Sequence, residues 1–325
     1  MRPVARPDLS PGHRVVVPGR QWAGTAMVLA SATGFGSLAI LAKLGYAQGL
    51  GAEQALAFRF LLAAIGMVAL AFLLGQNPLR LERNRLLILL AMGALGYCAQ
   101  SLTYFLALRS LPASLVVLIA YIYPSLVVAA GWLFLRRAVS AKHLVALAAS
   151  FVGLVMLVGG AHFQLAWALV LAVASPVIYT AYILIGERVM GSVPALAASA
   201  VIITGAAVAF TLLAAITNQL ALPKTTGGWA VAVGLAVFPT MLAISLFLAG
   251  LPRVGAARAA LLSTWEPVVT VGLAVVVLGD RLSLIQVLGG VLVLLAVVVV
   301  QGAQLWRPGP AAGPAEPAEP AGMRT

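Results

Sequence analysis

Ten long runs of apolar residues, separated by short gaps that carry most of the charges, constrain this chain more than any other feature. The runs fall at 22–45, 55–75, 86–108, 112–135, 141–160, 165–187, 195–216, 228–250, 255–278 and 284–304. Roughly 20 apolar residues cross a bilayer as one helix, and a backbone inside lipid must satisfy its own hydrogen bonds. A β-barrel would show short segments of alternating hydropathy instead. The sequence therefore predicts an all-α integral membrane protein with ten transmembrane helices.

Composition excludes several other classes of protein. Of the 325 residues, 62% are hydrophobic and only 9% are charged, whereas about a quarter of the residues are charged in a typical soluble domain. A cytosolic enzyme, a secreted disulfide scaffold and a disordered protein are therefore excluded. The net charge of +12 would suit a nucleic-acid partner. However, the basic residues lie between apolar runs and not on one water-facing surface, so we expect a lipid bilayer and no nucleic acid.

Lysine and arginine also predict the orientation, because cytoplasmic loops carry an excess of them. If the amino terminus is cytoplasmic, fourteen of the twenty lie on the inside, and only Arg109, Lys224 and Arg281 lie outside. Both termini are therefore expected in the cytoplasm. Residues 1–21 and 305–325 are rich in Pro, Ala, Gly or Arg and are expected to be disordered tails.

An internal repeat relates the two halves of the chain at an offset of 143 residues. Three pairs of like residues coincide at this offset: Pro124 and Pro267, Ala113 and Ala256, and Ser140 and Ser283. The offset covers five spans, an odd number, so the copies must have opposite orientations in the membrane. The sequence therefore predicts two inverted five-helix repeats at 22–160 and 165–304, an arrangement found in many secondary transporters.

The chain resembles the drug/metabolite transporter superfamily, and within it the ten-span EamA-type transporters. The residues that carry this resemblance are LAFRFLLAA at 56–64, YFLALRSLPAS at 104–114, YIYP at 121–124, WEPVV at 265–269 and LGDRLS at 278–283. The resemblance implies a bacterial inner-membrane exporter or permease, with amino acids and related metabolites as the commonest cargo. The sequence departs from the family at RRAVS, 136–140, where the family usually has an acid.

Glu266 is the one acidic residue near the middle of an apolar run. An ionisable group at this depth costs about 2.5–3.5 kcal/mol or more, and it usually faces a cavity or a partner. Loss of water favours its neutral form, so it can load and release a proton when exposed to the two sides in turn. Two interpretations stay open: a proton-coupling or amine-binding site, and a structural hydrogen bond that joins two helices.

Paired prolines indicate where a substrate cavity would lie. Pro267 follows Glu266, and its repeat mate Pro124 follows Tyr123 in the fourth span. Proline frees a backbone carbonyl, and freed backbone at membrane depth is tolerated where it lines a cavity. Matched interruptions in the two halves point to a midplane site, so we expect a cavity between the fourth and ninth spans. Kinks without ligand contact are the alternative.

Helical spacing groups further polar residues on common faces. The candidate cavity-lining residues are Tyr97, Gln100, Ser101 and Tyr104 in span three, Tyr179 and Tyr182 in span six, and Ser263 with Glu266 in span nine. Hydrogen bonds between helices, worth about 0.6 kcal/mol on average, are the alternative role. Trp265, also mid-span, is expected either to wall the cavity or to pack against lipid. For Arg59, in span two, we favour a structural ion pair, with Glu53 as one candidate partner.

These features together predict a secondary transporter that exports a small metabolite, an amino acid or related compound, in exchange for protons. The chain has no Walker A pattern, so ATP is not expected to drive it, and we expect no cofactor or metal. An uncoupled permease or channel, a drug efflux protein and a membrane scaffold are the alternatives. An intramembrane enzyme is least favoured, because His13, His143 and His162 are spread along the chain without a HExxH motif.

Overall fold

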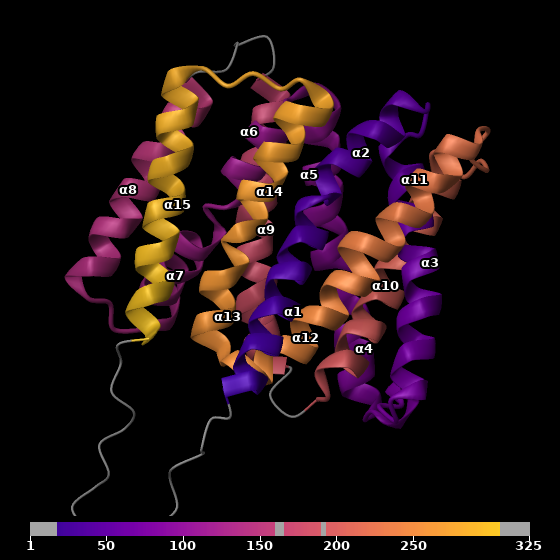
Figure 1. The fold of residues 1–325 in the computed structure, drawn as a ribbon. Coiled ribbons are helices and arrows are strands. Elements are labelled where there is room, and N and C mark those ends of the chain that lie inside the picture. The colour runs from indigo at the N-terminus through magenta and orange to yellow at the C-terminus, as the bar shows by residue number, and fades with distance from the viewer. Residues whose placement is uncertain (1–17, 160–165, 190–192, 306–325) are drawn as a thin grey trace, which may run out of the picture.

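The computed structural model describes residues 18–159, 166–189 and 193–305, and within them every regular element is a helix (Figure 1). Among the described residues, ten helices are long and apolar enough to cross a membrane, which confirms the prediction of an all-α, ten-span protein. The predicted tails at 1–21 and 305–325 lie almost wholly outside the described residues, as do His13 and His162.

Half of the spans are single helices and half are interrupted. The single helices are α3 (Ala52–Leu73), α8 (Ala141–Gly159), α9 (Ala166–Val189), α10 (Ala195–Ile216) and α15 (Leu284–Leu305). The interrupted spans are α1 (Pro18–Gly36) with α2 (Leu38–Ala47), α4 (Arg83–Ala91) with α5 (Cys98–Ser110), α6 (Ala113–Ala120) with α7 (Tyr123–Leu135), α11 (Thr226–Ala236) with α12 (Ala243–Val254), and α13 (Ala256–Ser263) with α14 (Trp265–Leu273). The short elements are the 3₁₀ turn η1 (Pro78–Arg80) and the π-helical turns η2 (Met92–Tyr97), η4 (Val237–Leu242) and η5 (Ala274–Leu278).

The interruptions have identifiable causes. Helix α6 ends at a cap on Tyr121 and α13 at a cap on Thr264, positions that differ by the repeat offset of 143 residues. Each break lies three residues before a proline, Pro124 or Pro267, and a proline cannot donate to the carbonyl four residues earlier. The turns η2 and η4 widen the third and eighth spans, and π-helical turns of this kind kink a helix.

Packing between the spans follows the same offset. Three contacting pairs join spans that the offset relates: α3 with α10, α8 with α15, and α6 with α14. The other two contacting pairs are α1 with α12 and α5 with α9. The offset relates the span of α1 to that of α9 and the span of α5 to that of α12, so it relates one pair to the other. This exchange fits two copies related by a pseudo-two-fold axis, and the inverted repeat itself stays a prediction.

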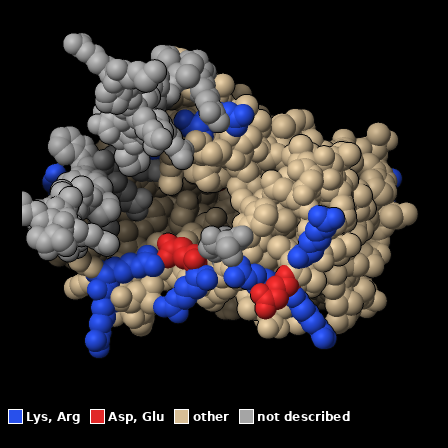
Figure 2. All heavy atoms as spheres, turned by 90° about the horizontal axis from the view of Figure 1, so that it is seen from below, with Lys and Arg blue, Asp and Glu red and all other residues tan. Residues whose placement is uncertain are grey.

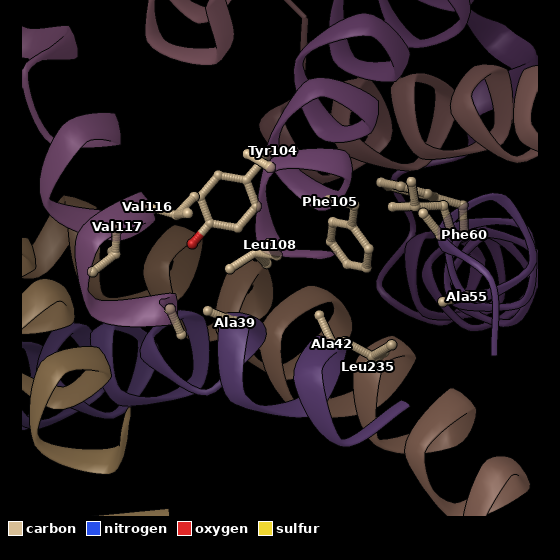
Figure 3. Packing of buried hydrophobic residues seen from close by; sticks show 14 of the residues in the cluster. Ala39, Ala42, Ala55, Phe60, Tyr104, Phe105, Leu108, Val116, Val117 and Leu235 are labelled. Atoms are coloured by element: carbon tan, nitrogen blue, oxygen red, sulfur yellow. The ribbon is translucent and has the colours of Figure 1, made fainter. Parts of the chain in front are cut away.

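Small side chains allow these helices to approach closely around a central core. In Figure 3, Ala39 and Ala42 of α2 lie near Leu108 of α5 and Leu235 of α11. Phe60 and Phe105 are fully buried there. Association of helices in a membrane depends on close packing and not on the hydrophobic effect, so this core fixes the spans around the site.

Basic residues gather at the end of the bundle where α1 begins, which Figure 2 shows face-on. Those near this end in the described chain include Arg80, Arg83, Arg85, Arg136, Arg137, Lys142, Arg188 and Arg253. The carboxylates of Glu82 and Glu187 lie 3.7 Å from Arg85 and 2.6 Å from Arg137. The opposite end carries Arg109, Lys224 and Arg281. This bias agrees with the sequence count, and the orientation stays a prediction.

Candidate functional site

A cavity of about 370 Å³ lies at the centre of the bundle, a size typical of small-molecule sites. Its walls come from α1, α2, α3, α5, α6, α7, α9, α12, α13, α14 and α15, and from Tyr97 at the end of η2. A larger hollow, about 650 Å³, lies between α3 and α10. Its lining is almost wholly aliphatic and includes exposed side chains such as Ile65 and Leu212. It lacks the convergent polar groups that mark a binding site.

The structure brings most of the predicted residues to the central cavity. Those that line it are Tyr97, Gln100, Ser101, Tyr104, Tyr123, Tyr179, Ser263 and Glu266. Pro124 and Pro267 are buried beside it and shape its walls through the breaks that they cause. Tyr182 lies one layer behind, stacked on both Tyr97 and Tyr179 with ring centroids 5.8 Å apart in each pair. The predicted place between the fourth and ninth spans matches α6 and α7 on one side and α13 and α14 on the other.

Trp265 does not line the cavity. It is 46% exposed, and its indole Nε1–H donates to the hydroxyl of Thr33 on α1 at 3.2 Å. The sequence left open whether Trp265 lines the cavity or packs against lipid, and this placement fits packing at the outside of the bundle. The break at Thr264 turns consecutive residues toward different surroundings, so Glu266 faces the cavity while Trp265 faces away from it.

Glu266 belongs to a hydrogen-bonded group that joins the two halves of the chain. The hydroxyl of Tyr121, the residue that caps α6, lies 3.1 Å from Glu266 Oε2 and 2.8 Å from the backbone carbonyl of Ser263. That carbonyl lacks its usual helical donor, because the residue four positions later is Pro267. Tyr121 therefore replaces the hydrogen bond that the proline removes, and the same hydroxyl fixes the carboxyl group.

Counting protons shows what this arrangement can do chemically. A phenol carries one hydrogen, so Tyr121 cannot donate to the carbonyl of Ser263 and to an ionised Glu266 at the same time. If Glu266 is protonated, it donates to the Tyr121 oxygen while Tyr121 donates to the carbonyl, and both contacts are hydrogen bonds. Protonation of Glu266 thus changes the hydrogen bonding across the break between α13 and α14.

Tyrosines form a continuous row along the cavity. Tyr121 contacts Tyr123, and Tyr123 contacts Tyr179, with ring centroids 5.9 and 4.9 Å apart. Tyr182 links Tyr179 to Tyr97, which in turn packs edge-on against Phe60 on α3. Aromatic walls with a few polar groups are the usual surroundings of an organic ligand.

Amides and hydroxyls make up the rest of the polar wall. Gln100 donates from Nε2 to the hydroxyl of Ser175 at 3.1 Å, and Ser101 donates to Gln100 Oε1 at 3.3 Å. Gln301 on α15 also lines the cavity, and its Oε1 atom is buried without a hydrogen-bond partner. An unpaired acceptor of this kind is available to a ligand, because buried polar atoms are normally paired.

Arg59 corrects one expectation from the sequence. It does not pair with Glu53. Its side chain is 2% exposed, lines the cavity, and donates from Nε to the hydroxyl of Thr240 on η4 at 2.9 Å. The predicted ion pair required the Arg59 side chain to point toward the end of its span. In the structure the side chain points into the central cavity instead.

The two ends of the cavity are sealed differently. All eight residues of α6 but Ala120 are buried, whereas in the described part of its repeat mate α13 only Ala259 is buried. At the α6 end, Asp280 Oδ2 accepts from both the backbone N–H and the hydroxyl of Ser114, at 3.0 and 2.8 Å. This contact joins the two halves of the chain at the end that carries Arg281.

Sequence reasoning missed Tyr121, Arg59 and Gln301 as cavity residues. Tyr121 and Arg59 stood within the quoted YIYP and LAFRFLLAA stretches, so the family resemblance was a usable signal for both. Nothing in the sequence marked Gln301. Across the described residues no group of three His, Cys, Asp or Glu could hold a metal ion.

Comparisons with known proteins place this geometry in a family. The model of the EamA-like transporter family matches residues 22–159 and again residues 166–301. The uncharacterized transporter YcbK of Bacillus subtilis (strain 168) is 28% identical over 278 residues, which cover 82% of this chain and 89% of YcbK. A protein of known crystal structure is 19% identical and has the same fold, with a TM-score of 0.64 over 88% of this chain and 99% of that one. The chain is therefore a multi-pass membrane protein that belongs to the EamA-like transporter family, and its role is that of a transporter and not of an enzyme.

Proposed function

We propose that this transporter exports a small metabolite, an amino acid or a related compound, across the bacterial inner membrane in exchange for protons. The observation that carries the proposal is Glu266, the one acidic side chain among the described residues that line the central cavity. It sits at the first turn of α14, beside the break in the ninth span, and contacts Tyr121 across the repeat boundary. Both termini face the cytoplasm in this proposal.

Competition for one carboxylate supplies the coupling. When the cavity faces the outside, Glu266 takes up a proton and the cargo leaves. When the cavity faces the cytoplasm, the proton leaves and the cargo's ammonium group replaces it on the carboxylate. A proton and a cation cannot occupy the same carboxylate oxygen together, so each crossing carries one or the other. The proton gradient therefore drives the cargo outward.

The test uses purified protein in liposomes and a mixed pool of labelled amino acids and small amines. An imposed pH gradient should make one class of solute accumulate on the acidic side, and dissipating the gradient should abolish the accumulation. Glu266→Gln keeps the size and removes the charge, so it should lose gradient-driven accumulation. Glu187→Gln, which removes an acid from the exposed Arg137 pair, is the matched control and should transport normally.

Two results would contradict the proposal. Wild-type rates in Glu266→Gln under a pH gradient would show that this carboxyl group does not couple protons. Equal fluxes with and without the gradient in the wild-type protein would favour an uncoupled permease.

A further inference from the structure

Arg59 is a buried cation without a matching anion in the described part of the chain. A guanidinium group stays charged in proteins. The carboxylates found in ion pairs there are Glu82 and Glu187. They pair with Arg85 and Arg137 on the basic face, which is the end of the bundle where α1 begins. Burying a charge is costly unless an opposite charge or several hydrogen bonds compensate it. The site of Arg59 therefore lacks its counter-ion.

Its existing contacts orient the guanidinium and do not neutralise it. Thr240 donates its hydroxyl hydrogen to the carbonyl of Leu235 at 2.9 Å, so its oxygen is free to accept from Arg59 Nε. The ring centroids of Phe60 and Phe105 lie 4.6 and 5.8 Å from the guanidinium carbon. Tyr97 is a further hydrogen-bond partner of the Arg59 side chain. None of these partners is a carboxylate, and an anion would bind at the terminal guanidinium nitrogens.

The charges on the cavity wall indicate which solutes can bind in the central cavity. Arg59 is the one basic and Glu266 the one acidic residue among the described lining residues. They form no ion pair with each other, and Tyr104 lines the same cavity. A solute with one negative and one positive group would meet a partner for each. A dianion such as phosphate would have a single basic partner and an opposing carboxylate.

We propose that Arg59 binds the carboxylate of the transported solute through its terminal guanidinium nitrogens. The proposal rests on the central cavity as the cargo site of the proposed function. In this proposal Arg59 selects the cargo, because it requires a carboxylate on the solute. Glu266 couples the transport of that solute to protons. The planar fork of arginine matches a carboxylate with two parallel hydrogen bonds, which lysine cannot reproduce.

The experiment measures binding to purified wild-type protein at one fixed pH and with no gradient. The probes are leucine, phenylalanine and glutamine, each compared with the amine that remains when its carboxylate is removed. Apparent affinity is the ligand concentration that gives half of the maximal rise in melting temperature. At least one amino acid should stabilise the protein, and its amine should bind about 30-fold or more weakly, the effect of truncating one partner of a buried charge pair.

Variants then locate the effect. Arg59→Met should lose the response to the amino acid without lowering the melting temperature of the unliganded protein, because it removes an uncompensated buried charge. Arg59→Lys keeps the charge and should bind more weakly than the wild type. Arg137→Met removes an arginine from the basic face and should respond normally, which makes it the matched control.

Each of three results would overturn the proposal. The amine could bind as tightly as its amino acid, inorganic phosphate could stabilise the protein where no amino acid does, or Arg59→Met could retain the response. A melting temperature that falls in Arg59→Met while binding persists would assign Arg59 a structural role. Because no gradient is applied, loss of proton coupling in Glu266→Gln would leave this result unchanged, so the two proposals fail separately.

Discussion

Asp280 should control how often the cavity opens at the end sealed by α6. Its Oδ2 atom accepts two hydrogen bonds from Ser114, which is fully buried, at 3.0 and 2.8 Å. Hydrogen bonds to a charged group contribute about 1.5–3 kcal/mol each. Asp280→Asn keeps an oxygen that can accept a hydrogen bond but removes the negative charge. We therefore expect the closed state to lose about 2 kcal/mol of stabilisation relative to the open state. That loss corresponds to about a 30-fold rise in the open fraction.

A reporter cysteine makes this opening measurable. In a Cys98→Ala background, Val117→Cys places a thiol on α6 at the cavity wall, where the native side chain is 3% exposed. A membrane-impermeant maleimide added to intact cells should label it about 30-fold faster with Asp280→Asn. Arg281→Gln, in the same turn and exposed, is the control and should not change the rate.

Labelling rates within about twofold of each other would refute the reasoning, since a 2 kcal/mol effect is much larger than that. A lower melting temperature together with unchanged labelling would show that the Ser114 contact stabilises the fold without sealing the cavity.

Two further substitutions test the site and the packing. Tyr121→Phe removes one hydroxyl, so the carbonyl of Ser263 and the carboxyl group of Glu266 both lose their hydrogen-bond partner. We expect gradient-driven uptake to fall about tenfold, and wild-type uptake would contradict this. Gly93→Ala would place a methyl group in collision with the backbone oxygen of Ile202 on α10, so the melting temperature should drop by several degrees, as expected for about 1–3 kcal/mol of overpacking. Gly272→Ala, which meets nothing within 4 Å, should melt within about a degree of the wild type, and equal melting of both alanine variants would contradict the close packing at η2.

The number and type of the spans followed from hydropathy alone. Lipid admits few spanning structures, so ten apolar runs of sufficient length leave one solution. The central polar wall was predictable for a related reason. A polar side chain in mid-membrane needs a partner or a cavity, and eight of the candidate residues do line the cavity.

The residues that escaped prediction are those whose position depends on irregular backbone or distant packing. The interruption before Pro124 changes the helical phase, so Tyr121 meets Glu266 although the offset pairs Tyr123 with it. Arg59 finds its partner Thr240 at a separation of 181 residues, on a π-helical turn that no local pattern reveals. Helical periodicity describes neither feature.

The most direct measurement counts protons against cargo in sealed proteoliposomes that contain a pH-sensitive dye. For wild-type protein loaded with the solute identified by the uptake screen, we predict that each solute molecule moving one way is matched by a fixed number of protons moving the other way. Glu266→Gln should still bind the solute's carboxylate through Arg59 but move no protons. Solute movement without any proton movement in the wild type, or unchanged proton movement in Glu266→Gln, would contradict exchange at this carboxyl group.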